Sequence, residues 1–160
     1  LALALAGVMT LALLTGCSDS SSQAKQVEEI SGKEGKFADY QKDETLDKKL
    51  EAIAQQFQPD WLDNRTGGLT EHARTIIINE LRGYLLTGSV WLWYGEVKPG
   101  QSALAQAESM KYSQGDEIAL LDSGIPTLQA IAFTMTGKKS DGHRYYLALR
   151  TNATIKTPQN

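Results

Sequence analysis

The chain opens with an apolar run that carries no charge, from Leu1 to Leu14. A helix that crosses a bilayer needs about 20 apolar residues, so this run is too short for a span and has the length typical of the apolar region of a signal peptide. It ends at small residues and at Cys17, the one cysteine of the chain. A buried apolar helix with an incidental cysteine is the alternative, but the serine-rich stretch 18–22 that follows at once is typical of a tether.

The run closes with Leu14-Thr15-Gly16-Cys17. This segment resembles the lipobox of bacterial lipoproteins, and the resemblance covers residues 1–17 only. It implies that the thiol of Cys17 receives a diacylglyceryl group, that a peptidase removes residues 1–16 as a signal peptide, and that a fatty acid such as palmitate acylates the new amino terminus. More than one acyl chain gives stable membrane anchoring.

The same resemblance implies that the protein is located in the cell envelope. In many Gram-negative bacteria an aspartate directly after the lipidated cysteine favours retention at the inner membrane, whereas here that position is Ser18. We therefore expect a lipid anchor in the outer membrane, with the protein facing the periplasm. Secretory signals have an initiator methionine and basic residues ahead of their apolar region. Neither precedes the apolar run here, so we expect that the sequence is a fragment or that its start is wrongly assigned.

Composition narrows the classes of partner and of chemistry. Residues 17–60 carry ten acidic and six basic side chains, and residues 61–160 carry nine acidic and ten basic ones. Because no basic stripe stands out, nucleic-acid binding has little support. With Cys17 acylated, the rest of the chain has no thiol for a disulfide, a nucleophile or a zinc ligand. We therefore expect a fold held by its apolar core alone.

The order of segments predicts one domain behind a tether. Residues 17–42 are rich in Ser, Gln, Lys, Glu and Gly, and we expect them to be a flexible tether with a reach of about 25–30 Å. Residues 43–151 are expected to form a single α+β domain, and residues 152–160 a frayed tail.

Two helices are expected at the start of this domain. The first spans residues 44–57, where Leu46, Leu50, Ile53 and Phe57 recur at helical spacing, with Asp43 or Thr45 as its cap. The second spans residues 71–86 behind the cap Thr70. Its β-branched run 76–78 suits a strand as well.

The pattern after Gly88 changes to the period of a strand. Strands are expected at residues 90–94, 117–121, 127–136 and 143–151, whereas residues 102–112 fit either a helix or a strand. Helices followed by strands indicate an α+β fold, with two N-terminal helices packed on an antiparallel sheet of about four strands.

Trp91, Trp93 and Tyr94 are the leading candidates for a binding surface. A strand with large aromatic residues on both faces is either covered on both sides or exposes one of them, and an exposed tryptophan pair could stack on a sugar or anchor a protein. Coverage by neighbouring helices and strands is the alternative. Three residues on the expected outward face of the last strand could extend such a surface: Arg144, Tyr146 and Arg150.

Catalytic and metal-binding patterns are weak. His72 beside Glu71 and His143 near Asp141 would need to meet in space, and neither pair has the spacing of a known metal motif or of a serine-hydrolase triad. The adjacent carboxylates of Asp116 and Glu117 should point to opposite faces of a strand, or lie in a surface turn. We assign no catalytic residue, no metal ligand and no cofactor.

These observations favour a non-enzymatic accessory, assembly or binding role at a membrane. The expected partners are the membrane itself, through the acyl chains on Cys17, and an envelope protein or cell-wall component, with no nucleic acid. The alternative is an inhibitor or small-ligand-binding module of the periplasm. A hydrolytic enzyme is the third hypothesis, and it requires a pocket in which both histidines converge with acidic residues.

Overall fold

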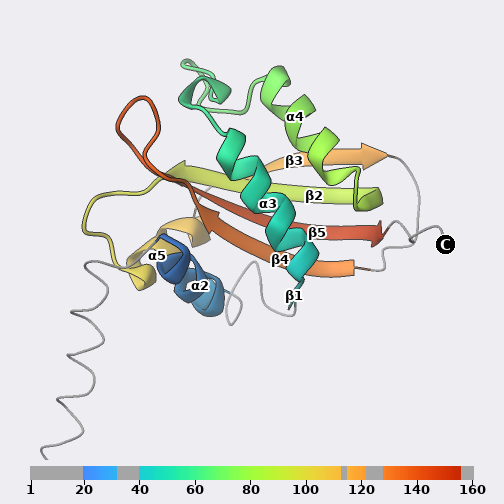
Figure 1. Ribbon diagram of the computed structural model, residues 1–160, viewed down its shortest axis with the longest axis horizontal. Coiled ribbons are helices and arrows are strands. Elements are labelled where there is room, and N and C mark those ends of the chain that lie inside the picture. The colour runs from blue at the N-terminus through green and yellow to red at the C-terminus, as the bar shows by residue number, and fades with distance from the viewer. Residues whose placement is uncertain (1–19, 32–39, 113–114, 122–127, 156–160) are drawn as a thin grey trace, which may run out of the picture.

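The computed structural model describes residues 20–31, 40–112, 115–121 and 128–155 (Figure 1). The expected lipidation site Cys17 and the signal peptide lie outside these ranges. The described residues form four α-helices, one short 3-10 helix and one sheet. The helices are α2 (Ser20–Ser31), α3 (Glu44–Gln56), the 3-10 helix η3 (Pro59–Trp61), α4 (Glu71–Leu81) and α5 (Ala103–Tyr112). The strands are β1 (Gln41–Lys42), β2 (Leu85–Glu96), β3 (Gly115–Leu121), β4 (Leu128–Met135) and β5 (Tyr145–Ile155).

The five strands form a mixed sheet in the order β1-β4-β5-β2-β3. β5 lies in the centre and pairs antiparallel with both β4 and β2, and β3 pairs antiparallel with β2 at one edge. At the other edge, Gln41 and Lys42 of β1 pair parallel with Ala130 and Ile131. The α+β class is confirmed. The predicted arrangement is wrong in three respects: the sheet is not wholly antiparallel, it has a fifth strand, and the helices are not all N-terminal.

Helices α3 and α4 cover one face of this sheet. Asp43 caps α3 by accepting a hydrogen bond from the backbone nitrogen of Leu46 at 2.7 Å, and Thr70 caps α4 in the same way at Ala73. Because leucines and isoleucines recur at helical spacing, each helix turns one apolar stripe towards the sheet. The core on this face contains Leu46, Leu50, Ile53, Phe57, Ile77, Leu81, Val90, Leu92, Leu147 and Leu149, all buried.

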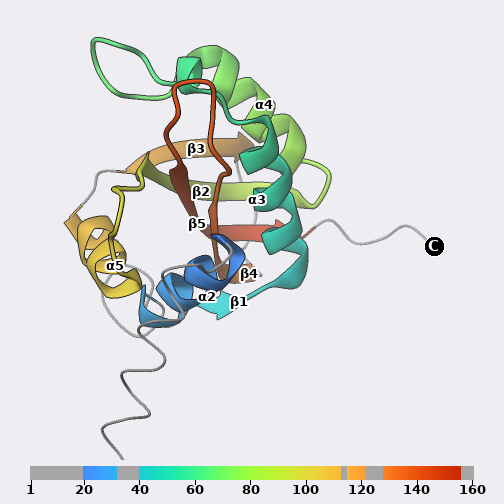
Figure 2. The same ribbon diagram turned by 60° about the vertical axis from the view of Figure 1, so that its left-hand side comes forward.

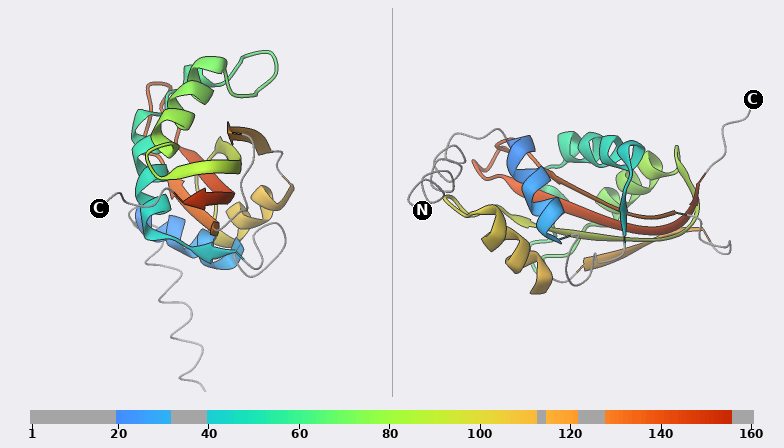
Figure 3. Two further views of the ribbon diagram at one scale, coloured as in Figure 1. Left: turned by 90° about the vertical axis from the view of Figure 1, so that its right-hand side faces the viewer. Right: turned by 90° about the horizontal axis from the view of Figure 1, so that it is seen from below.

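Helices α2 and α5 cover the opposite face. Ala24 and Val27 of α2 and Met110 of α5 are buried in a second apolar cluster, which the sheet completes with Trp93, Ile131, Phe133, Met135, Tyr146 and Ala148. Figure 3 shows α3 and α4 on one side of the strands and α5 on the other, and Figure 2 shows α2 beside α5. The sheet is therefore buried on both faces by helices, and its strands carry large apolar residues on both sides.

The flexible tether predicted over residues 17–42 is wrong for most of its described part. Residues 20–31 form α2, and residues 41–42 form β1. A polar composition hides the helix, because only Ala24, Val27 and Ile30 contact the apolar cluster. Most of the stability of such a helix comes from packing its apolar face, and not from intrinsic helix propensity.

Two further boundaries differ from the prediction. Helix α4 ends at Leu81, and β2 begins at Leu85 inside the range predicted as helical. The predicted tail 152–160 is wrong over residues 152–155, which continue β5 because they pair with the early residues of β2. Gly88 has a φ of +124°, and an ideal Cβ there would lie 2.5 Å from the carbonyl oxygen of Asn152 in β5, while the register of β2 against β3 shifts between Gly88 and Ser89. Only glycine fits this close approach.

Glu28 ties α2 to the exposed edge of the sheet. Its carboxylate accepts a hydrogen bond from the backbone of Phe133 in β4 and lies 3.2 Å from Nζ of Lys42 in β1. Lys42 in turn lies 3.5 Å from Asp47 of α3. Burial, and then the nearby charge of Asp47, raise the pKa of Glu28, whereas Lys42 and Phe133 oppose the shift. The carboxylate of Glu28 thus accepts from a backbone N–H of β4 at a position past the residues that pair with the short strand β1.

This arrangement predicts a pH-dependent effect of Glu28→Gln. Since the pKa of Glu28 is higher in the folded than in the unfolded chain, its contribution to stability is present below its ordinary value of 4.5 and is lost as pH rises through the raised value. Glutamine can still accept from Phe133 but does not ionise. We expect the free energy of unfolding of Glu28→Gln, relative to the wild type, to increase between about pH 4 and about pH 7. Urea unfolding measures this, and a difference that stays constant with pH would contradict it.

Candidate functional site

The aromatic residues of β2 divide between the two faces of the sheet. Trp91 and Trp93 face α2 and α5, with ring centroids 6.3 Å apart, whereas Tyr94 packs against the core beneath α3 and α4. Trp93 is only 3% exposed. Its indole lies over Gly115 of β3, where an added Cβ would come within 2.7 Å of the ring. Trp91, Trp93 and Tyr94 therefore do not form one binding surface, and of the tryptophan pair only Trp91 is partly exposed.

The face of β5 that we predicted to point outward is covered. Tyr146 is buried and its ring stacks on Phe133. The guanidinium of Arg150 lies between two rings, 5.3 Å from the centroid of Trp93 and 5.3 Å from that of Tyr40. These contacts are cation–π interactions, so Arg150 serves packing under α2. The prediction that this face of the strand points to solvent is wrong, because it did not include the helices α2 and α5 that cover the face.

The two histidines occupy different settings. His72 is an exposed residue in the first turn of α4. His143 precedes β5, where its Nδ1 lies 2.7 Å from Oε1 of Glu96 and its backbone nitrogen donates to Asp141. A cleft that contains His143 is lined neither by His72 nor by a carboxylate within the described ranges. The convergence of both histidines with acidic residues, which a hydrolytic site would need, is not found there.

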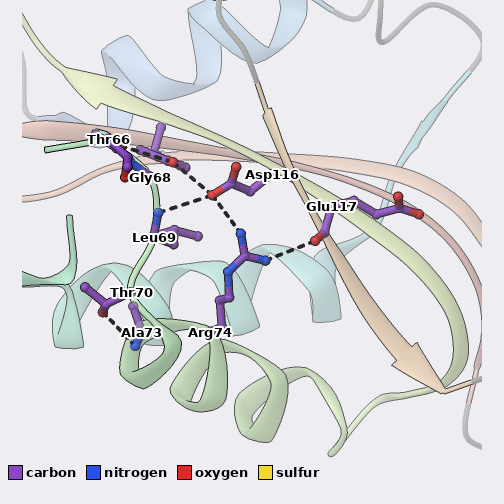
Figure 4. A network of polar contacts seen from close by, with 10 residues as sticks. Thr66, Gly68, Leu69, Thr70, Ala73, Arg74, Asp116 and Glu117 are labelled. Atoms are coloured by element: carbon purple, nitrogen blue, oxygen red, sulfur yellow. Dashed lines mark hydrogen bonds and ion pairs between the residues drawn. The ribbon is translucent and has the colours of Figure 1, made fainter. Parts of the chain in front are cut away.

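Asp116 is the centre of a polar network between β3, α4 and the preceding loop (Figure 4). Its Oδ2 accepts from the backbone nitrogen of Leu69 at 3.2 Å and from the hydroxyl of Tyr94 at 3.0 Å, and it lies 3.2 Å from Nη2 of Arg74. The other terminal nitrogen of Arg74 donates to the carbonyl oxygen of Glu117. Figure 4 shows the carboxylates of Asp116 and Glu117 pointing apart, as expected for neighbours in a strand.

This network is a structural anchor. Burial, and then the hydrogen bond to Asp116, raise the pKa of Tyr94 well above its ordinary value, which keeps the hydroxyl protonated as a donor. The loop before α4 folds on itself through an Asx turn at Asp63 and a bridge between Leu62 and Leu69. Asp116 joins this loop to the sheet. The prediction of a surface turn at Asp116 is wrong, because this residue lies inside β3.

A basic cleft lies at one end of the sheet. The chain after β2 and the loop between β4 and β5 leave the same end in Figure 1, because β2 and β5 are paired antiparallel. Between them is a cleft of about 340 Å³, with Gln23 of α2 on its wall. Its basic lining residues are Lys98, Lys138, His143 and Arg144, and we call them the basic cleft.

The two lysines and the arginine of the basic cleft are not neutralised by their neighbours, whereas His143 lies 2.7 Å from Glu96. Within the described residues, no ion pair involves Lys98, Lys138 or Arg144. Arg144 donates through Nε to the carbonyl oxygen of Thr136, and its Nη2 has no hydrogen-bond partner in the same part of the chain. Asp141, the nearest carboxylate in the loop, accepts from the hydroxyl of Tyr145. The cleft is therefore suited to an anion.

Sequence reasoning missed the basic cleft. Residues 98–100 and 137–142 belong to different connections that lie far apart in the sequence. Their approach depends on the register between Glu96 and Tyr145, which the sequence pattern does not reveal. The available signal was local charge: segments 97–101 and 136–144 together hold Lys98, Lys138, Lys139 and Arg144 against one carboxylate, in a chain of net charge −3.

No family model matches this chain, and no curated protein or solved structure is significantly similar to it. In the described ranges, no group of three or more His, Cys, Asp or Glu side chains is placed to hold a metal ion. In the same ranges, no helix has both the length and the apolar character needed to cross a bilayer.

The Asp116 network predicts a large difference between two adjacent carboxylates. Asp116→Ala leaves three donors without their acceptor, and we expect it to lower the free energy of unfolding by about 2–3 kcal/mol. Tyr94→Phe removes the hydroxyl that donates to Asp116 and to the carbonyl oxygen of Gly67, and should cost about 1 kcal/mol. Glu117→Ala, an exposed neighbour in the same strand, is the matched control and should stay within about 0.5 kcal/mol of the wild type. Denaturant unfolding of the three variants checks this, and equal costs for Asp116→Ala and Glu117→Ala would contradict it.

Proposed function

We propose that this chain is a lipid-anchored lipoprotein of the bacterial envelope, with a non-enzymatic accessory or binding role. The observation that carries the proposal is the uncharged apolar run that ends in Leu14-Thr15-Gly16-Cys17. The serine at position 18 favours the outer membrane, where the domain would face the periplasm. Acyl chains on Cys17 would hold the domain at that membrane throughout its life.

A binding role is favoured over catalysis because no described pocket brings both histidines together with acidic residues. His143 pairs with Glu96 in a cleft that His72 does not line, and Asp116 accepts from Leu69 and Tyr94 while pairing with Arg74. In the basic cleft, in contrast, Lys98, Lys138 and Arg144 have no counter-ion among the described residues. Recognition of an anionic surface or partner is the chemistry that such a site performs best.

Metabolic labelling with an alkyne fatty acid tests the anchor. The full chain is expressed in a bacterium with the same added start ahead of Leu1 in every variant. We expect the wild type to incorporate the label, to fractionate with membranes and to yield a mature protein that begins at Cys17. Cys17→Ala should lose the label and the cleavage before position 17, because the acylated thiol is gone.

A shifted thiol provides the matched control. The double variant Cys17→Ser with Ser18→Cys keeps one cysteine but moves it by one residue out of the motif. We expect no acyl label and no cleavage before position 17. Labelling of this variant at the wild-type level would show that any thiol in this region is acylated and would contradict a lipobox, as would an unlabelled wild type.

A further inference from the structure

The distance between the expected anchor and the domain is much shorter than the sequence suggested. Three peptide units separate Cys17 from Ser20, the first residue of α2. At most about 3.6 Å per residue, they place the two Cα atoms within about 11 Å of each other, whatever path the chain takes. A tether of twenty-five residues would have reached about 25–30 Å and left the domain free to turn.

Helix α2 then leads directly to the basic cleft. Gln23 lies one turn into α2, about 5 Å along the helix axis from Ser20. Its side-chain nitrogen donates to the carbonyl oxygen of Gln101 at 3.0 Å, and Gln23 itself lines the cleft. The rim of the basic cleft is therefore within about 16 Å of Cys17. An acyl anchor on Cys17 brings this end of the sheet to the membrane surface.

We propose that the basic cleft docks on the bilayer that holds Cys17 and binds the phosphate head groups of its anionic lipids. This inference rests on the proposed acylation of Cys17. The field of an anionic membrane fades within about one Debye length, roughly 8 Å at physiological ionic strength, so cations act only when they are held close to the surface. The short link allows Lys98, Lys138 and Arg144 to come this close when the cleft end of the sheet faces the bilayer.

The charge distribution supports lipid over a protein partner at this end. The chain as a whole is acidic, with a net charge of −3. The cations of the two loops are nevertheless gathered at the end near Cys17. Lys139 of the same loop points elsewhere, since its Nζ donates to the carbonyl oxygens of Ala54 and Gln55 at the end of α3. Docking would fix the orientation of the domain, with the far end of the sheet directed away from the bilayer.

The test uses the acylated full chain in vesicles. Cys17 is the only cysteine and its thiol is blocked by the lipid, so Ser140→Cys and Asn79→Cys each offer one site for a fluorophore. Both positions are exposed, Ser140 in the cleft loop and Asn79 in the last turns of α4. Lipids with a nitroxide on the head group quench a fluorophore near the surface. Vesicles are made of phosphatidylcholine alone, or with about one third phosphatidylglycerol.

We expect strong quenching of the Ser140→Cys label and weak quenching of the Asn79→Cys label in vesicles with phosphatidylglycerol. The difference should shrink in phosphatidylcholine alone and at high salt, because both weaken the attraction. Changing Lys98, Lys138 and Arg144 to Gln should reduce the ratio of docked to free domain by about fivefold for each charge removed. The matched control changes three exposed cations outside the cleft to Gln, namely Lys48, Arg65 and Arg82, and should keep the difference.

Three results would overturn the proposal. Equal quenching of the two labels in both kinds of vesicle would show that the cleft does not face the lipid. An equal loss in the control triple variant would show that net charge, and not the cleft, drives docking. Saturable binding of inorganic phosphate, with no response to phosphatidylglycerol, would assign the cleft to a free anion. A chain that carries no acyl group and fails to join the vesicles would instead reject the proposed function.

Discussion

The packing of α2 on the sheet is the contact on which the rest of the structure depends. Val27 is fully buried and Ala24 nearly so, and together they cover Ile131, Phe133 and Met135 with the help of α5. Full burial of a valine side chain contributes about 1.5–3 kcal/mol. Without α2, the second face of the sheet would expose a contiguous apolar surface, and the edge of β4 would lose the carboxylate that accepts from Phe133. The described part of the domain therefore includes α2 from Ser20 on, and two residues lie between Ser20 and Cys17 in the sequence.

That packing also determines what the aromatic residues do. Trp93 would be exposed on an uncovered sheet, but in the cluster that α2 and α5 complete it is buried, with the partly buried Arg150 against its ring. The polar network around Asp116 secures the other side, where it joins the loop before α4 to β3. The groups with spare binding capacity are the cations at the end of the sheet near α2. If Cys17 is acylated as we propose, the short link would give these cations a defined position relative to the membrane and so connect the fold with the anchor.

The sequence predicted the elements whose periodicity is strong. Helix α3 follows from Leu46, Leu50 and Ile53, and the alternation of Val90, Leu92 and Tyr94 correctly separates the two faces of β2. The sequence did not predict the features that depend on tertiary contacts. Helix α2 is polar on most sides, and its residues resemble a linker until a sheet is present to pack against. The basic cleft depends on strand pairing that brings distant loops together, and no local pattern records such pairing.

The most direct test of this structure is hydrogen exchange of the α2 amides in the full chain. If α2 is packed on the sheet, the amides from Ala24 to Ile30 should exchange only when the fold unfolds on a large scale, as the amides of α3 do. The protection of the two helices should then be comparable. Exchange of these amides at the rate of an unstructured peptide, while α3 stays protected, would contradict the structure. That result would favour a flexible tether over residues 17–42, and the basic cleft would then have no reason to lie at the membrane.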